Sequence, residues 1–302
     1  MMVTPAYAKL NLALSVAGRR PDGRHELRSV VVRLDWHDLV GVEIGAAGSA
    51  RIGDPAASGA MPSGEAAEIS VRVSGPAAFE VPAEDNLVLR AARAVLLAGG
   101  PVGAVRLFVE KRLPAAAGLG GGSADAAAVL RLLGGGGSPA GDPGMLRLAD
   151  TLGSDVPACL AGGSLLVGGA GERLEPLLHP PLDLAVAVAG RSGTAATFAA
   201  LTPDEWRGPE RPDALARLLS EGRPVPPGLC GSDLEQAACR AHPELGAALL
   251  RLRGGMPQAV WHLTGSGGAV FALAAGRGEA VALAAGARDL GFAARPCRTV
   301  AV

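Results

Sequence analysis

Three groups of residues in this sequence are of types that could together transfer a phosphoryl group. Residues 118–123 are a glycine-rich run ahead of residues that favour a helix. The unpaired N–H groups of such a loop, with the positive end of the helix dipole, attract phosphate. Lys9 supplies a cation and Asp155 a carboxylate. Phosphoryl transfer to a hydroxyl needs positioned phosphates, a cation for the spreading charge and a base for the acceptor.

Each of these groups also has an ordinary structural explanation. The loop could be a flexible connection in a chain with 44 glycines, Lys9 a surface side chain and Asp155 a helix cap. The P-loop pattern fails because no lysine follows the last glycine, and the dinucleotide fingerprint fails because Ser123 stands where its third glycine should be. Protein-kinase signatures are absent from the sequence. The loop by itself therefore leaves phosphate binding and a flexible connection open.

The hydrophobic pattern predicts the elements that would position these residues. Apolar residues alternate over 8–16, which indicates a strand with Lys9 and Asn11 on one side. Alternation over 105–110 predicts a strand before the loop, and Ser123 could cap the helix that follows it. Asp85 could cap another helix over 86–97.

The same patterns predict the remaining elements. Strands are expected at 30–34, 39–44, 69–73, 165–167, 184–189, 260–264, 270–274 and 293–300. Helices are expected around 145–152, within 202–223 and 233–252, and at 279–290, with a turn at 20–23 and an exposed insertion loop at 45–67. Because strands and helices do not alternate regularly, the pattern indicates an α+β fold.

Composition limits the classes of protein to which the chain could belong. Its 302 residues suffice for one large domain or two ordinary ones, and 49% apolar residues provide for a core. A net charge of −1 and an aromatic content of 3% argue against a nucleic-acid partner. No apolar run is long enough to span a membrane, and the arginines at 19–20 follow the apolar stretch instead of preceding it as in a signal peptide. The four cysteines lack metal or redox spacing, so we expect free thiols and a cytoplasmic protein.

Lysine and asparagine are scarce in this chain. Among its 28 Lys and Arg residues only Lys9 and Lys111 are lysines, and Asn11 and Asn86 are its two asparagines. A compact ammonium differs from a planar guanidinium in geometry and hydration, so lysine can be required where arginine fails. These four residues are therefore candidates for a site.

The segment 114–127 (PAAAGLGGGSADAA) resembles the phosphate loop of the GHMP kinases, which include galactokinase and the homoserine, mevalonate and phosphomevalonate kinases. Within that group the chain is most similar to the members that act on a cytidyl diphosphate of methylerythritol. Further motifs occur in the order found in those members: 8–12 (AKLNL), 20–25 (RPDGRH), 84–87 (EDNL), 111–114 (KRLP), 152–157 (LGSDVP), 232–235 (SDLE) and 263–268 (LTGSGG). They span nearly the whole chain.

The resemblance implies a fold, a reaction and its cofactors. The fold would be the two-domain α+β GHMP kinase fold, with a ribosomal-S5-like, ATP-binding domain at 1–160 and a ferredoxin-like domain at 161–302. ATP and Mg²⁺ would be used to phosphorylate the 2-hydroxyl of the cytidyl diphosphate substrate, in non-mevalonate isoprenoid precursor synthesis. We expect no nucleic-acid or membrane partner and a monomer or homodimer. The Mg²⁺ ligands are unknown, with Ser123 as a candidate.

The resemblance also assigns roles to individual residues. Asp155 would be the base that takes the hydroxyl proton, and Lys9 the catalytic lysine. The ATP-binding residues would be Asn86, Lys111, Pro114, Ala115, Ala116, Ala117, Gly118, Leu119, Gly120, Gly121, Gly122, Ser123 and Ala124. The substrate-binding residues would be Asn11, Arg24, His25, Thr194, Gly265, Ser266 and Gly267.

One substrate residue departs from the family, which usually has an aromatic side chain where this chain has Arg24. A guanidinium could stack on cytosine, bind the diphosphate or point to solvent. Two other functions remain open: a GHMP kinase for homoserine or a mevalonate derivative, and a non-catalytic sensor with the same fold. His25 speaks against the first, and the presence of both Lys9 and Asp155 against the second.

Overall fold

The computed structural model describes residues 1–45, 69–78, 86–100, 103–134 and 142–300. Most of the expected insertion loop at 45–67 and the expected cap Asp85 lie outside them. The chain forms two compact units. The first comprises Met1–Ala8, Trp36–Ala115 and Gly121–Ala161, and the second comprises Lys9–Asp35, Ala116–Gly120 and Gly162–Val302. The division into domains at residue 160 stays a prediction.

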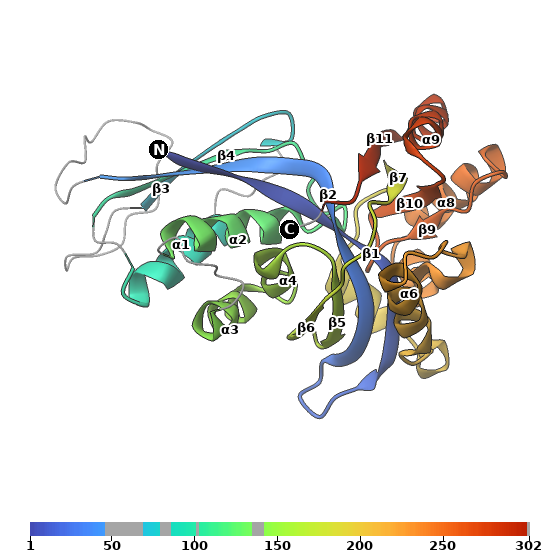
Figure 1. Cartoon of the computed structure of the whole chain (residues 1–302), viewed down its shortest axis with the longest axis horizontal. Coiled ribbons are helices and arrows are strands. Elements are labelled where there is room, and N and C mark those ends of the chain that lie inside the picture. The colour runs from blue at the N-terminus through green and yellow to red at the C-terminus, as the bar shows by residue number, and fades with distance from the viewer. Residues whose placement is uncertain (46–68, 79–85, 101–102, 135–141, 301–302) are drawn as a thin grey trace. The chain divides into compact units, whose positions relative to one another are not determined.

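Two long strands, β1 (Met2–Arg19) and β2 (His25–Ile44), pass through both units (Figure 1). In the first unit the end of β2 pairs antiparallel with β4 (Val105–Glu110), which pairs parallel with β3 (Ile69–Ser74). Helices α1 (Leu87–Leu97) and α2 (Gly121–Leu133) cover one face of these strands, and α3 (Pro143–Leu152) and α4 (Val156–Ala161) pack beside them. Their apolar side chains form one core, to which Val40, Leu107 and Ala127 belong.

The second unit contains the rest of that sheet and a second sheet. The first half of β2 pairs antiparallel with β5 (Leu165–Gly169), β5 with β6 (Arg173–Pro176), and β1 pairs parallel with β8 (Gly231–Ser232). The second sheet has the order β11-β7-β10-β9, formed by Ala293–Arg298, Asp183–Val188, Ala269–Ala274 and His262–Leu263. The helices are α5 (Thr194–Ala200), α6 (Glu210–Ser220), α7 (Glu235–Ala241), α8 (Pro243–Gly255) and α9 (Arg277–Asp289), with 3-10 turns η3 (Pro203–Glu205) and η4 (Pro227–Leu229).

The α+β prediction is confirmed, and two local predictions need correction. The expected strands at 30–34 and 39–44 are one strand, β2, because the polar residue Asp38 is buried there with hydrogen-bond partners. Ser123 does not cap α2, which already begins at Gly121; burial of the helix outweighs the poor helix propensity of glycine. The prediction that 233–252 is largely helical is confirmed, and the run is divided into two helices because His242 precedes Pro243 and takes a non-helical conformation.

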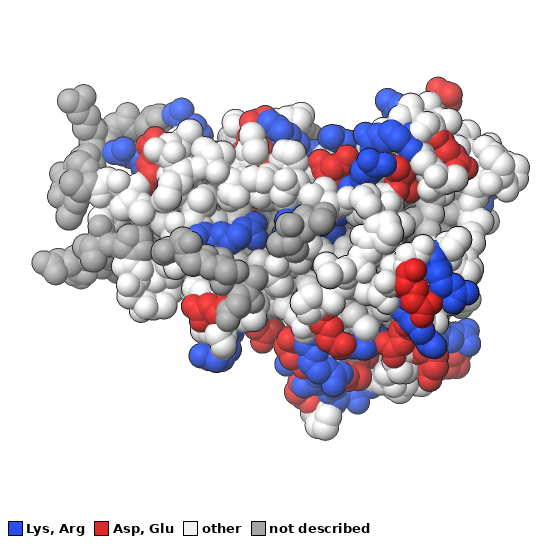
Figure 2. All heavy atoms as spheres, in the orientation of Figure 1, with Lys and Arg blue, Asp and Glu red and all other residues white. Residues whose placement is uncertain are grey.

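The surface and the cysteines carry little that points to other classes of protein. On the face that Figure 2 presents, acidic and basic side chains of the described residues are intermixed, without a broad area of one charge. Among the described residues, no helix has the length and apolar character needed to cross a membrane. The four cysteines are free thiols, and burial raises the pKa of Cys230 to about 12.

Candidate functional site

The glycine-rich loop is divided between the two units, and its residues 116–120 belong to the second. There the backbone N–H of Lys9 donates a hydrogen bond to the carbonyl oxygen of Leu119 at 2.9 Å. Gly120 has a φ of +68°, and a Cβ at that position would lie 2.7 Å from Cγ of Lys9. Two features therefore exclude a side chain at Gly120: its left-handed backbone conformation and the aliphatic part of the Lys9 side chain. This part of the loop therefore packs directly against Lys9.

Lys9 and Asn11 lie on one side of β1, as the alternation predicted. Lys9 Nζ donates to Asn11 Oδ1 at 3.0 Å, and Asn11 Nδ2 donates to Ser29 Oγ at 2.8 Å. Asn11 is buried, and its backbone N–H donates to Thr264 Oγ1 at 2.8 Å. The hydrogen bonds fix which end of the amide faces the lysine.

A second glycine turn, Thr264 to Gly268, follows β9 and packs on the first loop. A Cβ at Gly118 would overlap the carbonyl oxygen of Gly267, so the two loops meet backbone to backbone. Thr194, at the start of α5, shares a 3.0 Å hydrogen bond with Ser266 Oγ. The structure thus brings Lys9, Asn11, Thr194, Ala116–Gly120 and the 265–267 turn into one unit.

His25 has an aromatic neighbour that the sequence reasoning missed. The ring of Phe198, on α5, stacks on the ring of His25 with centroids 4.9 Å apart and planes 26° apart, and both side chains are half-buried. Burial lowers the pKa of His25, and the nearby Arg19 adds to that effect. Aromatic residues are scarce in this chain, and Phe198 is one of its five phenylalanines. That scarcity is a signal in the sequence by which Phe198 could have been identified as a site candidate.

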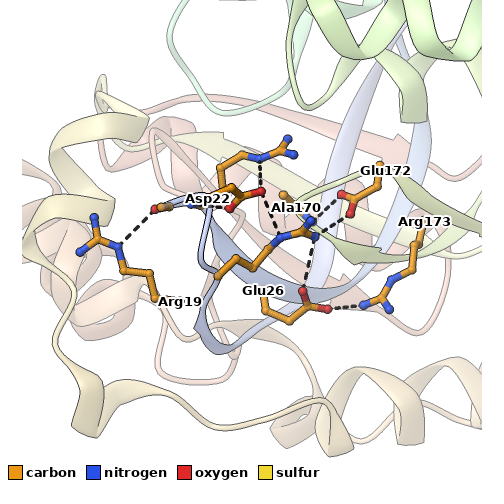
Figure 3. Close-up of polar contacts among 9 residues, drawn as sticks. Arg19, Asp22, Glu26, Ala170, Glu172 and Arg173 are labelled. Atoms are coloured by element: carbon orange, nitrogen blue, oxygen red, sulfur yellow. Dashed lines mark hydrogen bonds and ion pairs between the residues drawn. The ribbon is translucent and has the colours of Figure 1, made fainter.

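Arg24 lies in the turn between β1 and β2, where Asp22, Glu26 and Glu172 belong to a network of charges (Figure 3). Its Nε is 3.3 Å from Asp22 Oδ2, and its side chain is 51% exposed. In the same network, Arg20 Nη1 lies 2.6 Å from Glu172 Oε1 of the turn after β5. Arg24 therefore has a carboxylate partner within its own turn.

Two predicted site residues lie at helix starts in the first unit. Asp155 directly precedes α4, is half-buried, and its carbonyl oxygen accepts the backbone N–H of Cys159 at 3.1 Å. Asn86, in place of the expected Asp85, caps α1: its side-chain oxygen accepts the backbone N–H of Val88 at 2.9 Å. Both positions are compatible with the helix-cap explanation as well as with a site.

Lys111 is the centre of a buried charge cluster in the first unit. Its ammonium donates to Asp38 and, at 2.8 Å, to Asp125 Oδ2. Burial favours the neutral amine, but the two carboxylates outweigh it and raise the pKa of Lys111. Burial raises the pKa of Asp125 to about 7 although Lys111 opposes it. The Lys111 ammonium is thus bonded to two carboxylates within the protein.

Comparisons with known proteins agree with the fold and the loop. The family described as "GHMP kinases N terminal domain" matches residues 86–163. A 4-diphosphocytidyl-2-C-methyl-D-erythritol kinase of Rhizorhabdus wittichii is 38% identical over 89% of this chain and 84% of its own length, and one of Xanthobacter autotrophicus is 40% identical over 90% and 89%. A crystal structure of 4-(cytidine 5'-diphospho)-2C-methyl-D-erythritol kinase, 33% identical, matches both chains over their full length with a TM-score of 0.75. Homoserine kinase from Cytophaga hutchinsonii shares the fold, with a TM-score of 0.62 at 14% identity over 98% of this chain and 95% of its own.

Among these relatives, the α+β fold is that of small-molecule kinases. The chain belongs to the GHMP kinase family and is a small-molecule kinase. GHMP kinases use ATP.

Proposed function

We propose that the protein transfers the γ-phosphoryl group of ATP to the 2-hydroxyl of 4-diphosphocytidyl-2-C-methyl-D-erythritol, in non-mevalonate isoprenoid precursor synthesis. Relatives with this kinase name match about nine-tenths of the chain. Within the structure, the observation that carries the proposal is the placement of Lys9. Its backbone is bonded to the glycine loop through Leu119, and its ammonium is bonded to Asn11. A cation in that position can stabilise the negative charge of a phosphoryl group held by the loop.

The proposed chemistry needs one further group, a base for the acceptor hydroxyl. We assign that role to Asp155, which takes the proton as the hydroxyl oxygen attacks the γ-phosphorus. Lys9 stabilises the charge that spreads over the transferred group. In this assignment Asn11 binds the acceptor, because its amide is already oriented by Ser29 and Lys9.

The loop suits a triphosphate. A Cβ would fill the space at Gly120, and α2 begins at the next residue, so N–H groups and the helix dipole are available to anionic oxygens. Mg²⁺ would accompany ATP and neutralise its phosphates. The described residues contain no group of three or more His, Cys, Asp or Glu gathered for a metal, which suits an ion held largely by the phosphates, with Ser123 as a candidate ligand.

Cytosine is assigned to the half-buried ring pair of His25 and Phe198. An aromatic face offers stacking to a base, and a neutral imidazole offers one donor and one acceptor to its edge. Burial, with the nearby Arg19, lowers the pKa of His25 and so favours the neutral imidazole. The two-domain division at residue 160, with ATP bound by the N-terminal part, belongs to the same proposal.

ADP formation measured with each acceptor tests the proposal. Purified protein, ATP and Mg²⁺ are incubated with the cytidyl substrate, homoserine or mevalonate, and the Asp155→Asn variant serves as the control for contaminating kinases. We expect turnover with the cytidyl substrate that is lost in the variant. Faster turnover with homoserine or mevalonate would assign the chain to another branch of the family, and ATP binding without turnover of any acceptor would indicate a sensor.

A further inference from the structure

A buried aspartate holds the segment that leads into the glycine loop. Asp38, on β2, is 0% exposed, and its Oδ1 accepts the backbone N–H groups of Arg112 and, at 2.8 Å, Leu113. Its Oδ2 accepts the ammonium of Lys111. These are the residues that directly precede Pro114 and the loop. One carboxylate thus binds three successive residues of this segment.

The same ammonium reaches the helix that follows the loop. Lys111 Nζ donates to Oδ2 of Asp125, which lies on α2 and is 3% exposed. At Gly121, the first residue of α2, a Cβ would lie 3.4 Å from Lys111 Nζ and 3.7 Å from Asp38 Oδ2. The first turn of the helix therefore rests directly on the charge cluster.

We propose that Asp38 is a positioning residue for nucleotide binding, because its carboxylate holds the segment before the glycine loop and is linked through the Lys111 ammonium to the helix after it. This inference rests on the proposed function, in which the loop holds the triphosphate. Lys111 acts with Asp38 in this role and touches no phosphate, since the residue is 4% exposed and its ammonium is bonded to two carboxylates. If either flank moves, the loop N–H groups move with it, and phosphate affinity depends on their placement.

The two aspartates of the cluster contribute differently. An amide in place of the Asp38 carboxylate would either turn its NH₂ toward the Lys111 ammonium, so that two donors face each other, or lose the backbone N–H groups. Asp125 Oδ1, by contrast, is buried and has no hydrogen-bond partner among the described residues. Asparagine at position 125 can keep its amide oxygen toward the Lys111 ammonium and place its NH₂ where Oδ1 now stands, so the hydrogen bond from Lys111 is retained.

Calorimetric titration with a non-hydrolysable ATP analogue and Mg²⁺ tests the inference without any acceptor. In the full-length protein, Asp38→Asn should weaken analogue binding by about 10-fold or more, the scale of a lost charge-assisted hydrogen bond. Asp125→Asn should bind nearly as the wild type does. Asp183→Asn is the matched control: Asp183 is a buried aspartate of the second unit, paired with Arg298, so its loss should lower the Tm but leave the Kd unchanged.

The titration separates positioning from general stability. A folded Asp38→Asn variant with the wild-type Kd would overturn the inference, and so would equal weakening by Asp38→Asn and Asp125→Asn, which would assign the effect to the ammonium alone. If Asp38→Asn does not fold, the double variant Asp38→Asn/Lys111→Met removes the opposed donor; weak binding by it supports the inference and wild-type binding overturns it. A wild-type protein that binds no analogue would overturn the proposed function and this inference with it.

Discussion

The carboxylate of Glu205 should hold α5, the helix that carries Phe198, through an acid-sensitive set of hydrogen bonds. Glu205 Oε2 accepts the backbone N–H of Thr202 at 2.9 Å, the Thr202 hydroxyl at 2.8 Å and Arg240 Nη2 at 2.6 Å. Arg240 also donates to the carbonyl oxygen of Ala200, the last residue of α5, at 2.7 Å. The Arg240 hydrogen bonds, with help from Thr202, lower the pKa of Glu205 from 4.5 to about 2.

The size and the pH range of the effect follow from this shift. A pKa that falls from 4.5 to about 2 on folding corresponds to at most about 3 kcal/mol of stability. Because the Arg240 side chain is 46% exposed, screening by solvent reduces the expected contribution to about 2 kcal/mol. A carboxylate with a depressed folded pKa stabilises above its unfolded pKa, so this contribution is present above about pH 4.5 and is lost between about pH 4.5 and 2.

Urea unfolding of the wild type and of Glu205→Gln at pH 7, 4.5 and 3 measures the contribution. The variant should be less stable by about 2 kcal/mol at pH 7, and the difference should shrink as the pH falls to 3. Arg223→Gln is the control, because its ion pair with Glu221 is exposed on both sides and should contribute little. A difference between wild type and Glu205→Gln that is independent of pH would refute the assignment of the depressed pKa.

Three further predictions concern the proposed site. Asp155→Asn should lower turnover by about 10²–10⁴-fold with little change in ATP-analogue binding; near-normal kcat would leave Asp155 as a helix cap. Lys9→Arg should have a much lower kcat although the charge is kept, because the Lys9 side chain lies against Gly120 and a planar guanidinium needs more room. A fully active variant would contradict this prediction. Phe198→Ala should raise KM for the cytidyl substrate, because a lost stacking contact weakens binding by about 1–3 kcal/mol. Arg24→Ala loses an exposed ion pair and should leave KM nearly unchanged. Equal effects of the two variants on KM would refute the assignment of cytosine to His25 and Phe198.

Elements whose residues follow a short period could be predicted from the sequence. Alternation placed Lys9 and Asn11 on the same side of a strand, and the 3.0 Å bond between them confirms it. The alternating residues 105–110, the glycines and the alanine-rich run after them indicated strand, loop and helix, which the structure contains. These features are local, so each depends only on neighbouring residues, and the order of the motifs was enough to indicate the family.

Features that depend on contacts between segments distant in sequence were found only in the folded chain. Nothing near His25 in sequence indicates that Phe198 of α5 stacks on it. The sequence predicts two strands, at 30–34 and 39–44, on either side of a segment that contains Asp38. The strand is continuous because residues 111–113 supply hydrogen-bond donors to the buried carboxylate. The scarcity of lysine makes Lys111 a site candidate and the family resemblance assigns it to ATP; in the structure its ammonium is bonded to two buried carboxylates. A buried charge is stable only with its partners in place, and the partners of Lys111, Asp38 and Asp125, come from a strand and a helix that only folding brings together.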